Sequence, residues 1–119
     1  MPQNAIALNF SATTARRSGS IKPITAASRT MALADVGKWL EFNSGSGQAA
    51  ILPADNVVSF PISTVLTGRQ AGVGTVTFSA GAGATVQSAG GKLATAAQYA
   101  VWSAVKVAAN TWSLFGNLA

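Results

Sequence analysis

The chain has 119 residues and a net charge of +5, with 49% apolar residues and only 9% charged ones, far below the roughly 25% of an ordinary soluble domain. Its length fits one domain, and a surface so poor in charge indicates an oligomer or a component of an assembly rather than a solitary monomer. Without cysteine or histidine, it can form no disulfide, no thiolate or imidazole metal site and none of the usual catalytic triads.

Residues 1–30 have no sustained period of 2 or of 3.6, which is typical of an extended arm with little secondary structure of its own. This arm carries four bases and no acid: Arg16, Arg17, Lys22 and Arg29. It also has alternating apolar residues that can act as anchors: Ile6, Leu8 and Phe10. The arm is therefore either a solvated tail or a segment that becomes ordered on a neighbouring subunit.

The sequence changes character at residue 31, where a β domain is predicted to begin. Residues 31–37 predict one helical turn that ends at Gly37, with Thr30 as its N-cap. Residues 38–43 alternate, with Leu40 and Phe42 on one face and Trp39 and Glu41 on the other. This alternation predicts a half-buried strand.

The central part of the chain predicts several short strands separated by turns. Strands are expected at 48–52, 57–60, 62–67, 75–79 and 84–87, with glycine turns at 71–74, 81–83 and 88–91. The charge-free stretch 70–91 is long enough to cross a bilayer, but its six glycines argue against a membrane span. Short strands with this spacing are typical of a sandwich, a barrel or a small trimer-forming β knob.

Residues 93–108 fit two patterns. A helix would place Leu93, Ala97, Val101 and Val105 on one face, whereas a strand would place Trp102 opposite the valines. Asn110 then predicts a turn before residues 112–115, so a terminal hairpin is expected.

The acidic residues give little support to catalysis. Only Asp35, Glu41 and Asp55 are present, and a glycosidase would need two of them facing each other across a sugar. Glu41 and Asp55 could meet across strands, but ordinary roles on a strand face and in turns explain them as well. The paired glycines lack the third glycine and the βαβ context of a nucleotide site. We therefore expect no enzyme, no metal and no cofactor.

Two binding chemistries remain. The bases of the arm could contact phosphates, but without interleaved aromatic residues an acidic protein surface is favoured over nucleic acid. The aromatic side chains could form a sugar-stacking platform, although in a small β domain they more often pack in the core or between subunits. These aromatic residues are Trp39, Tyr99, Trp102 and Trp112.

From about Thr30 to its end, the sequence carries in order a set of turn and strand pieces that together resemble a small β domain found in structural proteins of tailed bacteriophages, both fibres and head-associated proteins. The pieces are residues 31–38, 41–44, 70–78, 81–86, 88–93, 97–99, 110–112 and 114–116. The resemblance implies an all-β fold, which favours the strand alternative for 93–108, and it transfers no catalytic residue.

We accordingly expect an extended basic arm at 1–30 and a β domain at 31–119, built as a small antiparallel sandwich or barrel. The expected function is that of a virion protein on the head surface, a capsid decoration or cement protein. It would form a homotrimer and bind the major capsid protein through Ile6, Leu8, Phe10, Arg16, Arg17, Lys22 and Arg29. The alternative is a tail-fibre or receptor-binding knob that recognises host carbohydrate.

Overall fold

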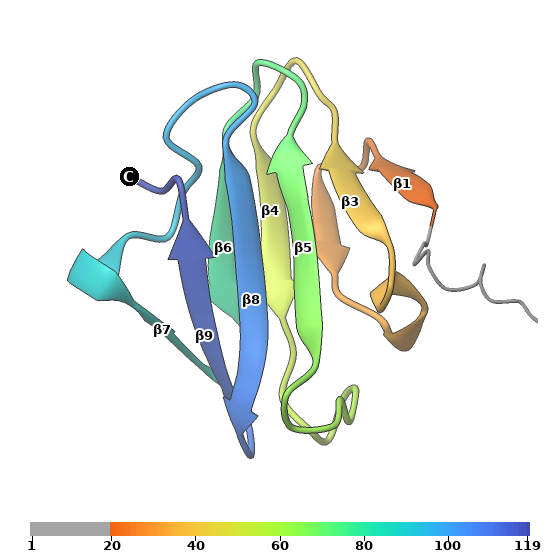
Figure 1. Ribbon diagram of the computed structural model, residues 1–119, viewed down its shortest axis with the longest axis vertical. Helices are drawn as coiled ribbons and strands as arrows, with labels where there is room; N and C mark the ends of the chain where they lie inside the picture. The colour runs from red at the N-terminus through yellow and green to blue at the C-terminus, as the bar shows by residue number, and fades with distance from the viewer. Residues whose placement is uncertain (1–19) are drawn as a thin grey trace, which may run out of the picture.

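The computed structural model describes residues 20–119, which form nine strands in two sheets and two short 3₁₀ helices, η1 and η2 (Figure 1). The six-stranded sheet has the order β1-β3-β5-β8-β9-β7, and the three-stranded sheet has the order β2-β4-β6. The elements are β1 (Ile21–Ile24), β2 (Ser28–Thr30), η1 (Leu33–Asp35), β3 (Trp39–Phe42), β4 (Gln48–Leu52), β5 (Val65–Gln70), β6 (Val76–Ala80), β7 (Thr85–Ser88), η2 (Ala89–Gly91), β8 (Val101–Ala108) and β9 (Thr111–Gly116).

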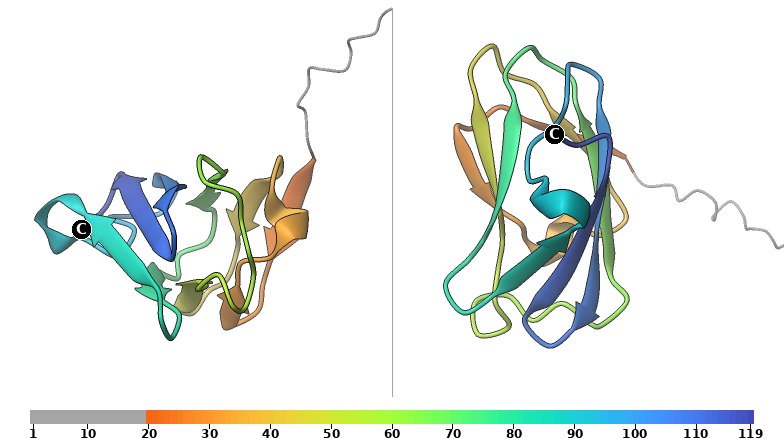
Figure 2. Two further views of the ribbon diagram at one scale, coloured as in Figure 1. Left: turned by 90° about the horizontal axis from the view of Figure 1, so that it is seen from below. Right: turned by 90° about the vertical axis from the view of Figure 1, so that its left-hand side faces the viewer.

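From β1 to β6 the chain alternates between the two sheets, so that it winds through three successive coils (Figure 2). Each coil places its strands beside those of the previous coil in parallel register, for example Trp39 beside Ile21 and Thr67 beside Trp39. The turns 43–47 and 71–75 stack closely at one end, where a Cβ on Gly74 would overlap the carbonyl oxygen of Ser46. Glycine is therefore required at that corner.

The last strands close the six-stranded sheet by a different route. β7 lies at the far edge and pairs in parallel with β9, whereas β8 and β9 form an antiparallel hairpin between β5 and β7. Asn110 has a φ of 55° in the hairpin turn, a conformation that asparagine tolerates better than most residues.

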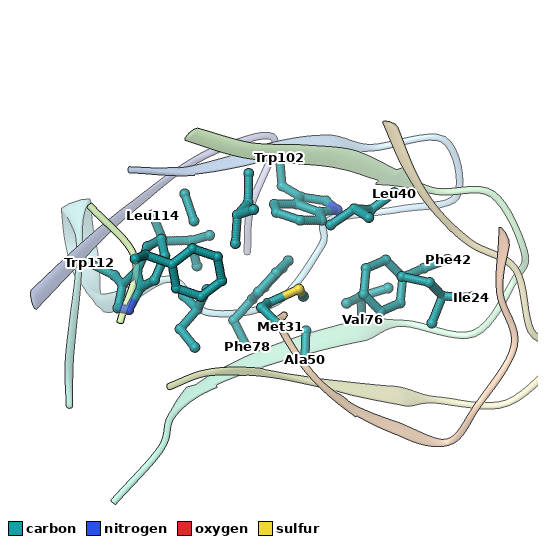
Figure 3. Packing of buried hydrophobic residues seen from close by; sticks show 14 residues of the cluster. Ile24, Met31, Leu40, Phe42, Ala50, Val76, Phe78, Trp102, Trp112 and Leu114 are labelled. Carbon is teal, nitrogen blue, oxygen red and sulfur yellow. The ribbon is translucent and has the colours of Figure 1, made fainter. Parts of the chain in front are cut away.

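Inward side chains from both sheets form one hydrophobic core (Figure 3). The ring of Trp102 lies edge-on to Phe42 and Phe78, with centroid distances of 5.9 and 4.8 Å. Because side chains alternate along a strand, every second residue of β3, β5, β8 and β9 enters this core.

The structure confirms the all-β class, the faces predicted for residues 39–42, the strand alternative for 101–108 and the terminal hairpin. The antiparallel expectation holds only for β5–β8 and β8–β9, because the five other strand pairs are parallel. Residues 57–60 and 62–64 form no strand; Pro61 lies in this stretch and cannot donate to a sheet.

Residues 21–30 were predicted to belong to the extended arm, but the structure places them in the β domain. β1 and β2 pair in register with β3 and β4, and Ile24 is buried in the core. Ile6, Leu8, Phe10, Arg16 and Arg17 lie outside the described residues. Within 20–119, no helix is long and apolar enough to span a membrane.

Candidate functional site

The outer face of the six-stranded sheet carries little charge and combines exposed apolar side chains with threonine and serine side chains. Its outward positions expose five large apolar side chains to between 45% and 64%: Ile21, Val65, Val101, Val107 and Phe115. The charged residues at the outward positions of its strands are Glu41 and Arg69, which pair with each other. A sheet face with this composition is suited to contact another surface rather than water.

Four side chains form a connected cluster on this face. Glu41 and Arg69 are register partners on β3 and β5, and the guanidinium binds the carboxylate through Nε at 2.7 Å and through a terminal nitrogen at 3.0 Å. The indole nitrogen of Trp39 donates to the same carboxylate at 3.0 Å. On the other side, the Arg69 guanidinium lies 5.5 Å from the centroid of the Tyr99 ring.

The charges of this cluster satisfy one another. The hydrogen bonds from Arg69 hold the pKa of the Glu41 carboxyl below its usual value, and Glu41 in turn raises the pKa of Arg69. The pair is therefore ionised at neutral pH, contributes no net charge and keeps both flanking aromatic rings in place.

Tyr99 has a strained backbone in this cluster. Its φ is 72°, a left-handed conformation that a bulky residue rarely adopts, and its N–H donates to the Gln70 carbonyl oxygen at 2.6 Å. The side chain is nevertheless 61% exposed. Because strained backbone conformations cluster at functional sites, Tyr99 is a candidate binding residue.

The structure separates the four predicted aromatic residues into two pairs. Trp39 and Tyr99 flank the Glu41–Arg69 pair on the outer face, whereas Trp102 and Trp112 are completely buried in the core. The carbohydrate hypothesis expected Trp102 to stack on a sugar, but this buried side chain cannot do so.

The bases Lys22 and Arg29, which were predicted to bind a capsid, are both paired with an acidic residue of the domain. Both turn inward at the first coil and bind Asp35, whose side chain is fully buried. Burial alone would raise the pKa of this carboxyl, but hydrogen bonds from the Ala32 N–H, Lys22 and Arg29 outweigh burial and lower it. Asp35 thus neutralises part of the charge that was expected to bind a capsid.

The two carboxylates that were considered as a catalytic pair lie on opposite sides of the six-stranded sheet. Glu41 is on the outer face, whereas Asp55 receives a hydrogen bond at 2.5 Å from Lys106, which points into the core. Among residues 20–119, no three acidic side chains gather as a metal site would require.

Sequence reasoning missed Arg69 and Phe115 as surface residues of interest. Their alternation with buried neighbours was a usable signal, but only the strand order shows that they share one face with Trp39.

The chain was also compared with known proteins. No family model, no curated protein and no solved structure matches it.

Proposed function

We propose that this protein is a virion structural protein, a capsid decoration or cement protein that docks on the head shell of a tailed bacteriophage. The observation that carries the docking role is the outer face of the six-stranded sheet, which has no net charge and exposes five large apolar side chains. The phage context comes from the sequence resemblance of residues 30–119. The docking role and the phage context both agree with a domain that has too few charged residues to cover its own surface.

The physical case for docking rests on what the outer face lacks. The cores of protein interfaces are depleted in charged residues and enriched in aromatic ones, as this face is with Trp39, Tyr99 and Phe115. A stable interface buries about 800 Å² on each partner, an area that one face of a small sheet can supply. Its single ion pair is already satisfied, so that covering it leaves no unpaired charge.

In this proposal the protein is a small β sandwich that assembles as a homotrimer around a symmetry axis of the shell. The major capsid protein is the partner. The N-terminal residues would add to this binding. Arg16 and Arg17 would contact acidic groups of the capsid protein, and Ile6, Leu8 and Phe10 would contact apolar ones. Lys22 and Arg29 share the carboxylate of Asp35, so they contribute less net positive charge to this role than Arg16 and Arg17.

The test is binding to purified phage heads stripped of the protein. The variants Val101→Thr and Phe115→Ser alter the outer face, and Val73→Thr serves as a matched control because Val73 is 67% exposed in the turn 71–75. We expect the combined outer-face variant to bind at least tenfold more weakly, while the control binds like the original protein. Unchanged binding of a folded outer-face variant would refute the proposal.

The alternative function is carbohydrate recognition by a receptor-binding module, and the Trp39–Glu41–Arg69–Tyr99 cluster favours it. Two partly exposed aromatic rings beside a fixed polar pair can stack on a sugar and bind its hydroxyls. Saturable binding to host polysaccharide that is lost in Tyr99→Ala and retained in Phe115→Ser would support this alternative against shell binding.

A further inference from the structure

Among residues 20–119, β1 and β2 each have a strand neighbour on one side only, so the first coil ends both sheets at the same end of the described domain. At the other edge of the three-stranded sheet, residues 93–95 cover β6: the Phe78 N–H donates to Leu93 at 2.7 Å and the Thr95 N–H to Val76 at 3.0 Å. The edge of β2 belongs to the three-stranded sheet and is therefore separate from the outer face of the six-stranded sheet.

The edge of β1 is poorly suited to accept another strand. The carbonyl groups of Ser20 and Ile24 accept hydrogen bonds from β3, so the intervening backbone groups of Ile21 and Pro23 point away from the sheet. Pro23 has no N–H, and this interrupts the outward row of donors. A proline at this position is a common protection of an edge strand.

The edge of β2 has no such interruption. Its backbone binds β4 through the carbonyl of Ala27 and the N–H of Met31, at 2.8 and 3.0 Å. In a parallel ladder the groups of Ser28 and Thr30 then point outward, and both residues are exposed. β2 thus offers two N–H and two C=O groups to an extended chain.

The side chains at this end carry more positive than negative charge. Lys22 and Arg29 share the single carboxylate of Asp35, and within the described part of the chain the buried Nε of Arg29 has no hydrogen-bond partner. A hollow of about 410 Å³, lined by Pro23, Ile24, Thr25, Ala26, Ser28, Arg29 and Thr30, opens beside them. The excess positive charge beside the hollow favours the binding of a carboxylate there.

We propose that β2 is a docking edge for an extended acidic segment of a partner protein. The segment adds a strand through Ser28 and Thr30, and its inward-pointing carboxylate binds Arg29 in the hollow. This interface goes beyond the proposed function and does not use the outer face. Main-chain bonds supply affinity, and the carboxylate supplies specificity.

The test uses the full-length ¹⁵N-labelled protein and capped pentapeptides of alternating threonine and valine, with either glutamate or glutamine at the centre. We expect the amides of Ser28 and Thr30 to shift and to become protected from exchange when the glutamate peptide binds. The glutamate peptide should bind about tenfold more tightly than the glutamine peptide. In Arg29→Gln this preference should disappear, whereas in Lys92→Gln, a change at an exposed lysine elsewhere, it should persist.

A second variant is needed because Arg29→Gln could lose binding by failing to fold. Ser28→Pro removes one outward donor and keeps every charge, so it should abolish binding in a protein that remains folded. The proposal is overturned if both peptides bind equally, if the shifts fall on β7 instead, or if the amides of Ser28 and Thr30 are already protected without peptide. Because stripped phage heads play no part in this test, its failure leaves the shell-docking proposal to be judged separately.

Discussion

The indole nitrogen of Trp112 donates a hydrogen bond to the carbonyl oxygen of Pro53 at 3.1 Å, which ties β9 to the segment that follows β4. Trp102 is equally buried, but its indole nitrogen has no partner among the described residues. The two tryptophans thus form a natural pair for measuring what one buried indole hydrogen bond contributes.

We predict that Trp112→Phe destabilises the protein more than Trp102→Phe. Both changes remove the same atoms from the core, but Trp112→Phe also leaves the buried Pro53 carbonyl unpaired, whereas Trp102→Phe removes a donor that has no acceptor. The difference in the free energy of unfolding should be about 1–2 kcal/mol. Urea denaturation followed by far-UV circular dichroism measures both, and an equal loss would contradict the assignment of the bond.

The second prediction concerns acid stability. The folded-state pKa of Asp35 lies below its unfolded value of about 3.9, so its ionised form stabilises the fold above that pH, and this contribution is lost as the pH falls through the folded pKa. Asp35→Asn should therefore destabilise the protein at pH 7 and do so progressively less below about pH 4. Melting temperatures between pH 7 and pH 2 measure this.

The matched control for Asp35 is Glu41→Gln. The Glu41 carboxylate also has a lowered pKa, but its partner Arg69 is on the exposed outer face. Its loss should change the melting temperature much less at every pH. If the two variants showed the same pH profile, the buried position of Asp35 would not be the cause.

The strands were predictable where the alternation was strong, as at Leu40 and Phe42 or along β8. Their pairing was not, because alternation is the same in parallel and antiparallel sheets, and the turns at 43–47 and 71–75 resemble hairpin turns in composition. Consecutive strands from β1 to β6 pair with the strand two further along the chain, a relation that local sequence does not encode.

The charges were misassigned for a related reason. Lys22 and Arg29 are separated from their partner Asp35 by 13 and 6 residues, and only the first coil brings the three together. The lack of a sustained period in residues 1–30 predicted an extended arm, and the lack of local acids suggested that its bases would bind an acidic partner. The cluster of Trp39 and Tyr99 likewise depends on the position of Arg69 between them.

The third prediction tests the close contact of the coils. Gly68 lies inward on β5, in register with Leu40 of β3 and Trp102 of β8, and a Cβ there would lie 2.8 Å from the carbonyl carbon of Leu40. Gly68→Ala must push β3 away and should cost about 3 kcal/mol. Gly45→Ala is the control, since no atom lies within 4 Å of its added Cβ, and its effect should stay within about 0.5 kcal/mol. Thermal unfolding compares the two.

The last prediction separates stability from binding at Tyr99. Its φ of 72° costs about 1 kcal/mol or more in a tyrosine and almost nothing in a glycine. Tyr99→Gly should therefore be as stable as the original protein or more stable, because relief of strain offsets the loss of the contact between the ring and Arg69. The same variant should bind its target on the outer face more weakly, since the exposed ring is gone. Tyr99→Ala removes the ring but keeps the strain, so it should bind as weakly as Tyr99→Gly while melting at a lower temperature. A Tyr99→Gly protein that melts well below the original would show that the ring stabilises the fold, and Tyr99 would then be a structural residue.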